Sequence, residues 1–366
     1  MLSQLAYFFG GIAVLVLGAE LLVRGASRLA AAAGVSALVI GLTVVAFGTS
    51  APELAVSLNA ATGGEPDLAI GNAVGSNIFN VLCILGLAAL LKPLVVHRQL
   101  IRIDVPVMIG VCALFWALSL DGSLSRTEGL IFILLLGGYL ALSVILGRKE
   151  SQKNGTPNSE PGAAAPPPMK RGAWIVDLLS IAVGLGFLVL GARWIVDSAT
   201  AMAQAMGVSD LIIALTVVAA GTSLPEVATS VMATLRGQRD IAVGNAIGSN
   251  IFNVLCILGF SAALAPEGVN VATPALHFDI PVMVAVCVAC YPIFFTGHTI
   301  ARWEGALFLA YYAAYTIYLI LKSMEHDGLQ AYSRAMIGYV VPLTVITLIV
   351  CFYRGWKDAR RGAPTP

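Results

Sequence analysis

Long apolar stretches alternate with short polar ones along almost the whole chain. The apolar runs are about 20 residues long, which is enough for a helix to cross the roughly 30 Å hydrocarbon core of a bilayer. Because a backbone in lipid must satisfy its own hydrogen bonds, such runs form helices. The pattern predicts eleven membrane-spanning helices, at 5–28, 37–62, 68–91, 103–120, 127–147, 174–200, 210–234, 241–264, 279–298, 302–322 and 336–353.

The composition agrees with this pattern. Of the 366 residues, 58% are hydrophobic and only 11% are charged, and the mean hydropathy is +0.88. A soluble domain carries about 25% charged residues. We therefore expect an all-α polytopic membrane protein rather than a soluble enzyme or a nucleic-acid-binding protein.

The sequence contains two copies of one pattern. TVVAFGTSAPELAVS at 43–57 is matched by TVVAAGTSLPEVATS at 216–230, and GNAVGSNIFNVLCILG at 71–86 by GNAIGSNIFNVLCILG at 244–259. Equivalent residues such as Glu53 and Glu226 lie 173 positions apart. A repeat of this length predicts two copies of one structural unit. Spans one to five form the first copy, spans six to ten form the second, and the eleventh span has no counterpart.

This repeat divides the chain into four expected segments. The first repeat occupies 1–147 and the second occupies 173–322. Between them, 148–172 is polar and rich in Pro and Ala, which predicts a flexible cytoplasmic linker. Residues 323–366 add an eleventh transmembrane helix and a basic cytoplasmic tail.

The charges of the loops predict how the copies are oriented. Five spans is an odd number, so the second copy must enter the membrane from the opposite side. With the N-terminus outside and the C-terminus in the cytoplasm, 17 Lys and Arg residues fall on the inner side and 4 on the outer side. Matched loops agree, since the outer TGGEPD at 62–67 corresponds to the inner LRGQRD at 235–240. The positive-inside rule therefore predicts two inverted-topology five-helix repeats.

One acidic residue lies in the middle of a span in each copy. Glu53 and Glu226 are expected at membrane depth, where a carboxylate costs about 2.5–3.5 kcal/mol on insertion scales. Each follows a proline, Pro52 or Pro225, which lacks an N–H group and breaks the helix. Irregular backbone at this depth is tolerated only where it is buried in protein or lines a cavity. We expect the two acids to be functional rather than a structural hydrogen-bonding pair.

Hydroxyl and amide groups accompany the glutamates. The breaks carry Thr49, Ser50, Thr222 and Ser223, and the spans that follow carry Ser76, Asn80, Ser249 and Asn253. Ser76 and Asn80 are four residues apart and share a helix face, as do Ser249 and Asn253. Together these groups predict an all-oxygen cation site with a formal charge of −2. Ca²⁺ and Na⁺ suit such a site, whereas Mg²⁺ demands a tighter octahedron and soft transition metals prefer thiolate or imidazole.

Further polar and sulfur-containing residues lie in the same spans. Four more amides are present, at Asn72, Asn77, Asn245 and Asn250, and some of them are expected to bond helix to helix instead of holding an ion. Cys287 and Cys290 form a CxxC without flanking polar ligands. We interpret these cysteines as small packing residues rather than a metal or redox site.

The doubled GTSxPE and GNxxGSNxxN motifs resemble the two alpha repeats of the cation/calcium exchanger superfamily, and in particular its prokaryotic sodium/calcium exchanger branch. The resemblance covers spans one to ten. It implies a ten-helix exchanger core in the inner membrane of a bacterium and exchange of Na⁺ for Ca²⁺ by alternating access. It implies no resident cofactor, because Ca²⁺ and Na⁺ are the transported ions.

The same resemblance implies roles for the residues of the motifs. Glu53 and Glu226 would be the ligands shared by Ca²⁺ and Na⁺. The other implied ligands are oxygens of Thr49, Ser50, Thr222 and Ser223, the flanking Ser76 and Ser249, the central Asn80 and Asn253, and backbone carbonyls near Ala46 and Ala219. Some relatives carry Asp at the position of Asn80 or Asn253. Asn at both positions argues against the potassium-dependent branch.

Other functions are weighed against this one. Coupling to H⁺ or K⁺, or transport of another divalent cation, is the main alternative, because the wording of the motif does not settle the coupling ion. An intramembrane enzyme would need an Asp-rich metal motif or a His/Asp pair, and neither occurs in this sequence. A passive channel fits a doubled site less well than a carrier does. The oligomeric state is left open.

Overall fold

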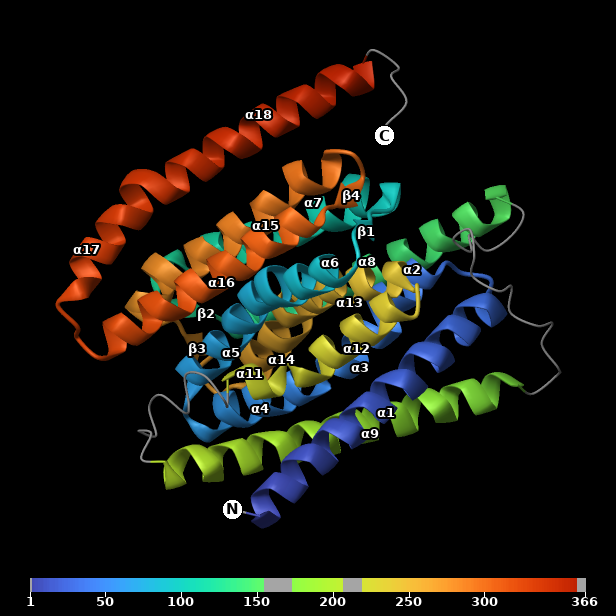
Figure 1. Ribbon diagram of the computed structural model, residues 1–366, viewed down its shortest axis with the longest axis horizontal. Coiled ribbons are helices and arrows are strands. Elements are labelled where there is room, and N and C mark those ends of the chain that lie inside the picture. The colour runs from blue at the N-terminus through green and yellow to red at the C-terminus, as the bar shows by residue number, and fades with distance from the viewer. Residues whose placement is uncertain (1, 155–172, 207–218, 361–366) are drawn as a thin grey trace.

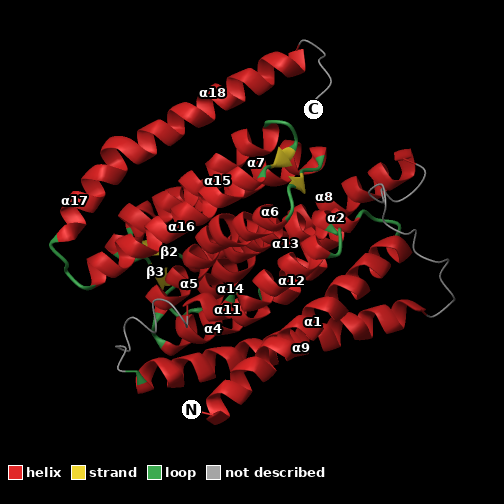
Figure 2. Cartoon of the chain, in the orientation of Figure 1, coloured by secondary structure: helices red, strands yellow, loops and turns green. Residues whose placement is uncertain are grey.

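The computed structural model describes residues 2–154, 173–206 and 219–360, and this part of the chain is almost entirely helical (Figures 1 and 2). In the first half, the helices are α1 (Leu2–Ala33), α2 (Ala37–Ile40), α3 (Ala46–Thr49), α4 (Ala51–Gly63), α5 (Pro66–Phe79), α6 (Gly86–Leu91), α7 (Val105–Leu118) and α8 (Arg126–Asn154). In the second half, they are α9 (Ala173–Ala205), α11 (Ala219–Thr222), α12 (Leu224–Leu235), α13 (Arg239–Phe252), α14 (Gly259–Leu264), α15 (Ile280–Phe295), α16 (Arg302–Ser323), α17 (Gly328–Ala335) and α18 (Val341–Arg360).

Short non-α turns join several of these helices without ending the span. The π-helical turns are η1 (Gly41–Val45), η2 (Asn80–Leu85), η3 (Leu100–Asp104), η6 (Asn253–Leu258), η7 (Ala275–Asp279) and η8 (Met336–Val340), and a 3₁₀ turn, η4, covers Ser119–Asp121. Single π turns inside α-helices are frequent at functional sites. Here η2 begins at Asn80 and η6 at Asn253, two of the predicted site residues.

The expected spans appear as helices wherever the structure describes the chain. Among the described residues, nine helices are long and apolar enough to cross a membrane, and α2–α3 with α4 form a further broken span, bent by 47°. The predicted span at 210–234 lies partly outside the described residues, and its described part is α11 and α12. Several boundaries differ from expectation. Helices α1, α9 and α18 end later than predicted, at Ala33, Ala205 and Arg360, α8 continues to Asn154 inside the expected linker, and α15 ends earlier, at Phe295.

The two longest helices, α1 and α9, lie side by side on one flank of the molecule (Figure 1). Their facing pairs are Gly11 with Gly191, Gly18 with Gly184 and Gly25 with Asp177. Because one number rises as the other falls, the helices run antiparallel. The backbones are so close that a Cβ atom on Gly191 would lie 2.6 Å from the Leu15 nitrogen. Glycine at these positions therefore allows close helix contact.

The centre of the molecule is formed by α5 with η2 and α13 with η6. These spans are 72% and 83% buried. Around them, the two halves make matching contacts, since α6 packs on α16 where Gly86 meets Gly305, and α14 packs on α8 where Gly259 meets Gly129. Four two-residue strands also pair across the two halves. β1 (Leu94–Val95) pairs with β4 (Thr299–Ile300), and β2 (Ser123–Leu124) pairs with β3 (Val269–Asn270). The sequence did not predict these strands, because two residues carry no recognisable periodicity.

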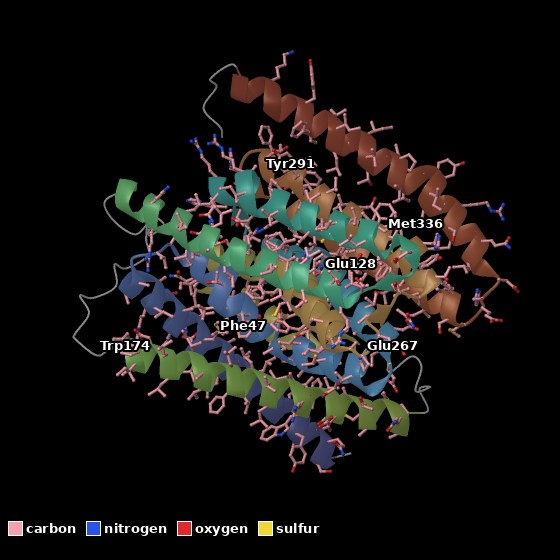
Figure 3. The ribbon with its side chains drawn as sticks, turned by 180° about the vertical axis from the view of Figure 1, so that it is seen from behind. Phe47, Glu128, Trp174, Glu267, Tyr291 and Met336 are labelled. Atoms are coloured by element: carbon pink, nitrogen blue, oxygen red, sulfur yellow. The ribbon has the colours of Figure 1, made fainter. Side chains whose placement is uncertain are left out.

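The C-terminal helices α17 and α18 lie on the side of the bundle away from α1 and α9 (Figure 1). The Phe352 ring of α18 lies 5.0 Å from the Phe295 ring and 6.3 Å from the Tyr291 ring of α15 (Figure 3). Many other apolar side chains of α18 face outward, such as Ile349, which is 61% exposed. An apolar surface of this kind is suited to contact with lipid.

Candidate cation-binding site

Both glutamates lie directly after a break in a helix. Ser50, between α3 and α4, has φ −82° and ψ 5°, and Ser223, between α11 and α12, has φ −90° and ψ 7°. A proline and then Glu53 or Glu226 follow in the first turn of the new helix. Proline is tolerated there because the first N–H groups of a helix have no intrahelical partner. The positive end of the helix dipole favours a carboxylate at the same place.

Hydroxyl groups from the opposite copy hold the two carboxylates. Ser50 Oγ donates to Glu226 Oε1 at 3.1 Å, and Ser223 Oγ donates to Glu53 Oε1 at 3.2 Å. Each copy therefore contributes the serine that positions the glutamate of the other. Both glutamates are only 1% exposed, and each accepts a hydrogen bond from the serine that lies three residues before the other. Two negative charges buried this close repel one another unless a positive charge lies between them.

The second oxygen of each carboxylate has no hydrogen-bond partner. Among the described residues, the same holds for other buried oxygens of the predicted site, and the set comprises Glu53 Oε2, Glu226 Oε2, Asn80 Oδ1, Asn253 Oδ1 and Ser249 Oγ. Ser76, the counterpart of Ser249, is also buried, at 6% exposure. Buried polar atoms are normally bonded, so the four glutamate and asparagine oxygens, which form a symmetric set, need an explanation. Carboxylate, amide and hydroxyl oxygens are the ligands that Ca²⁺ takes.

Two further amides, those of Asn72 and Asn245, bond to the helices that carry the glutamates. Asn72 Nδ2 donates to Ser57 Oγ at 2.9 Å and to the Glu53 backbone carbonyl at 3.2 Å. Asn245 makes the same two contacts with the equivalent serine and glutamate of the second copy, at 3.1 and 3.5 Å. Its Oδ1 also accepts a hydrogen bond from Thr49 Oγ1 at 3.1 Å. These residues therefore hold the glutamate-bearing turns in place.

The backbone carbonyls at the breaks are less free than the sequence suggested. The Ala46 carbonyl accepts from the Ser50 amide at 3.0 Å and from Thr49 Oγ1 at 3.4 Å, so the break does not leave it without a partner. Ala219 begins α11, directly after residues outside the described part of the chain. Thr222 ends α11 and is half-buried. The side-chain oxygens are thus the better-supported part of the predicted ligand set.

Another pair of acids, the buried Asp104 and the half-buried Asp279, does not belong to this site. Asp104 accepts hydrogen bonds from Tyr139 Oη and Gln99 Nε2, both at 3.2 Å, and Asp279 accepts one from Tyr315 Oη at 2.8 Å. Both carboxyl oxygens of Asp104 therefore have protein partners. The glutamates differ, because each keeps one oxygen to which no described residue donates a hydrogen bond. This contrast separates the structural acids from the candidate ligands.

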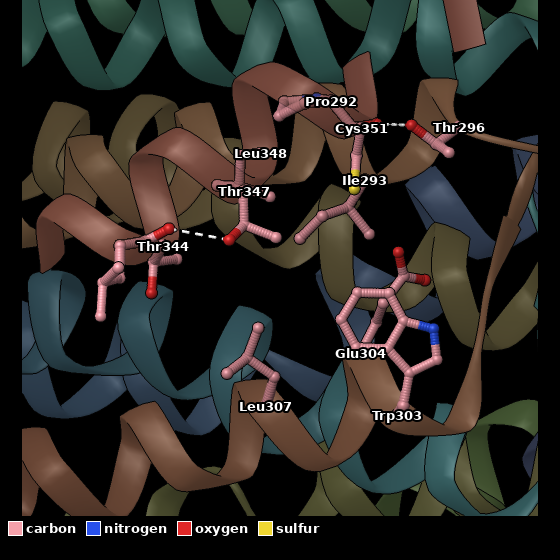
Figure 4. Close-up of a pocket in the computed structure, with 11 residues that line it drawn as sticks. Pro292, Ile293, Thr296, Trp303, Glu304, Leu307, Thr344, Thr347, Leu348 and Cys351 are labelled. Carbon is pink, nitrogen blue, oxygen red and sulfur yellow. Dashed lines mark hydrogen bonds between the residues drawn. The ribbon is translucent and has the colours of Figure 1, made fainter. Parts of the chain in front are cut away.

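A hollow elsewhere in the molecule is not the site. It has a volume of about 250 Å³ and lies between α15, α16 and α18 (Figure 4). The residues around it are Pro292, Ile293, Thr296, Trp303, Glu304, Leu307, Leu343, Thr344, Thr347, Leu348 and Cys351. None of the predicted ligands is among them. We interpret the hollow as a gap beside α18 rather than as part of the ion path.

The described residues hold no group of three or more His, Cys, Asp or Glu side chains arranged to bind a metal. The candidate site instead combines two carboxylates with hydroxyls and amides. Such a donor set suits cations that are bound and then released.

Comparison with known proteins identifies the family. The model of the sodium/calcium exchanger protein family matches residues 3–145 and 176–321, which is most of the chain. The chain belongs to the sodium/calcium exchanger family. It is therefore an integral membrane protein of a transporter family, as the resemblance of its motifs had indicated.

Individual proteins are similar to this chain over most of its length. The inner membrane protein YrbG of Escherichia coli is 38% identical over 79% of this chain and 88% of its own length. The sodium/calcium exchanger MaX1 of Methanosarcina acetivorans is 34% identical over 84% of this chain and 96% of its own. The solved structure of the sodium-calcium exchanger NCX_Mj superposes with a TM-score of 0.71, at 31% identity, over 85% of this chain and 96% of that one. The fold is thus that of an exchanger.

Proposed function

We propose that this protein is a secondary active antiporter that exchanges Na⁺ for Ca²⁺ at one site around Glu53 and Glu226. The observation that carries the proposal is the crossed pair of serine–glutamate hydrogen bonds, which leaves one oxygen of each buried carboxylate without a partner. Membership of the sodium/calcium exchanger family supports the choice of ions.

Charge balance explains why the two ions would exclude one another. One Ca²⁺ neutralises the two carboxylates, and so do two Na⁺ ions. Because both kinds of ion need the same two glutamates, neither binds while the other is present. Asn80, Asn253, Ser76 and Ser249 would supply neutral oxygens around them, with Thr49, Thr222 and the carbonyls near Ala46 and Ala219 as further candidates. Neutral oxygens allow several Na⁺ ions to bind without adding charge.

We propose alternating access through two inverted repeats, at 1–147 and 173–322, which are joined by a cytoplasmic linker. The antiparallel contact of α1 and α9 and the crossed bonds at the site support this arrangement. The loop charges support a cytoplasmic C-terminus and an outer N-terminus. The family resemblance suggests that α1 and α9 move against the rest of the bundle. The helix at Gly328–Tyr353 would be an additional span outside the exchanger core.

Transport in proteoliposomes tests the coupling ion directly. Vesicles containing the purified chain are loaded with Na⁺ and diluted into Na⁺-free medium with ⁴⁵Ca²⁺. We expect uptake that requires the outward Na⁺ gradient and that stops when an ionophore dissipates it. Parallel vesicles with outward K⁺ or H⁺ gradients test the alternative coupling. Uptake that proceeds equally well without Na⁺ on either side would overturn the proposal.

A further inference from the structure

Four asparagines link the two copies at the centre of the bundle. We call Asn77, Asn80, Asn250 and Asn253 the asparagine cluster. Asn253 Nδ2 donates to Asn77 Oδ1 at 2.9 Å, and Asn80 Nδ2 donates to Asn250 Oδ1 at 3.0 Å. Asn77 Nδ2 also donates to the backbone carbonyl of Asn250 at 3.3 Å. All four side chains are at most 1% exposed, so water cannot replace a lost partner easily.

The contacts of Asn77 determine which way the amide of Asn253 points. A backbone carbonyl can only accept, so the side of Asn77 that faces the Asn250 carbonyl must be its NH₂ group. Asn77 Oδ1 therefore faces Asn253, and Asn253 must offer its own NH₂ group to it. The oxygen of Asn253 is left on the other side of its amide, where no described residue donates a hydrogen bond to it.

Asn250 acts on Asn80 in the same way. Its Nδ2 lies 3.4 Å from Met108 Sδ, and a thioether sulfur is an acceptor and never a donor. Asn250 Oδ1 therefore faces Asn80 and accepts from its NH₂ group. The oxygen of Asn80 is left without a partner, as is that of Asn253.

We propose that Asn77 and Asn250 are positioning residues, which hold the amides of Asn253 and Asn80 with their oxygens toward the transported cation. The inference rests on the proposed function, because it takes Asn80 and Asn253 as part of the ion site. An amide that turned over would present an NH₂ group, and this would repel a cation. Each positioning residue lies in one copy and acts on a ligand of the other, as Ser50 and Ser223 do for the glutamates.

The arrangement also makes a specific demand on position 253. An ionised Asp at position 253 has no hydrogen-bond donor, so it would place a second acceptor against Asn77 Oδ1. The contact is restored only if the Asp is protonated or if Asn77 turns over and gives up its bond to the Asn250 carbonyl.

A double-mutant cycle on Ca²⁺ affinity tests the proposal. The affinity of the purified full chain is measured from ⁴⁵Ca²⁺ binding in detergent, which requires no Na⁺ gradient. Asn77→Leu should weaken Ca²⁺ binding about tenfold, as loss of a ligand-orienting partner typically does. In an Asn253→Ala background, the same change should have less than about a twofold effect, because the oriented oxygen is already gone.

Three controls separate positioning from general damage. Asn77→Asp should keep the affinity within about threefold of the wild type, because a protonated carboxyl donates to the Asn250 carbonyl and accepts from Asn253. In an Asn80→Ala background, Asn77→Leu should still weaken binding about tenfold, because Asn77 does not orient Asn80. Asn250→Leu should show the opposite pattern, losing its effect with Asn80→Ala and keeping it with Asn253→Ala.

The outcomes distinguish this inference from the proposed function. The proposed positioning role of Asn77 is wrong if Asn77→Leu weakens Ca²⁺ binding equally in the wild-type and Asn253→Ala backgrounds. It is also wrong if Asn77→Asp lowers the affinity as much as Asn77→Leu does. If the wild-type chain binds Ca²⁺ but its vesicles take up Ca²⁺ independently of Na⁺, only the antiport proposal is contradicted. A wild-type chain that binds no Ca²⁺ would overturn both.

Discussion

Two of the contacts between the halves of the chain differ in chemistry. At the centre, the contact is polar and made by buried Ser, Asn and Glu side chains, which bond across the copies. Between α1 and α9, the contact is largely apolar, and glycines bring the two backbones together. A buried polar contact favours one geometry because a mismatched donor or acceptor is costly. An apolar glycine surface has no such penalty. In the alternating access proposed above, the ion site would stay rigid while α1 and α9 move against the rest of the bundle.

The largest effect is expected at the polar centre. Glu53→Gln removes one of the two negative charges and should lower Ca²⁺ affinity by about two orders of magnitude, because ligand charge sets the affinity of calcium sites. Na⁺-driven ⁴⁵Ca²⁺ uptake should be lost. Glu226→Gln should have the same effect, since the two positions make equivalent contacts.

The matched control is Glu267→Gln, which changes an exposed acid in a loop between α14 and β3. If Glu53→Gln transports as the wild type does, the centre is not the ion site.

The apolar contact is expected to be the next most sensitive. Gly191→Ala places a Cβ atom 2.6 Å from the Leu15 nitrogen of α1, so the helices must separate. Overpacking of this kind costs about 1–3 kcal/mol, and we expect slower uptake with little change in Ca²⁺ affinity. Gly186→Ala is the control, because no described atom of a neighbouring helix lies within 4 Å of its added Cβ. Equal effects at the two glycines would show that the close helix contact does not matter for transport.

A smaller effect is expected where a charged pair ties α1 to the centre. Arg236 follows α12 and forms an ion pair with Glu20 on α1, where Nε donates to Oε2 at 2.9 Å. The guanidinium is half-exposed, so the pair should contribute about 0.2–1 kcal/mol and weaken in salt. Arg236→Gln should therefore change the uptake rate about twofold. Arg24→Gln is the comparison, because Arg24 contacts Glu20 within α1 and joins no second helix. The two variants should differ at low ionic strength and converge at high salt.

The least effect is expected from α17 and α18, which belong to neither contact. Removal of 324–366 deletes the aromatic contacts of Phe352 with α15, which are worth about 0.5–1.5 kcal/mol each. We expect a lower unfolding temperature but retained Na⁺-driven uptake. Loss of uptake in a truncated chain that remains monodisperse in detergent would place α18 in the transport mechanism.

Much of the site could be predicted from local sequence features. The mid-span Glu53 and Glu226, each after a proline, identified the helix breaks, and the four-residue spacing of Ser76 and Asn80 placed them on one face. The use of the other amides could not be predicted in this way. Asn77 and Asn72 lie in the same apolar run, yet Asn77 bonds to the other copy and Asn72 supports the broken helix of its own. Only contacts across the fold separate the two uses.

The membrane class, the helical spans, the doubled motif and the family could be read from the chain alone, because each depends on hydrophobic periodicity or on residue identity along the sequence. Which groups meet depends on the three-dimensional packing. Ser50 bonds Glu226 rather than the nearby Glu53, and β1 pairs with a strand of the other half. These partners lie far apart along the chain, where local periodicity carries no information. The packing of the two halves against each other decides them.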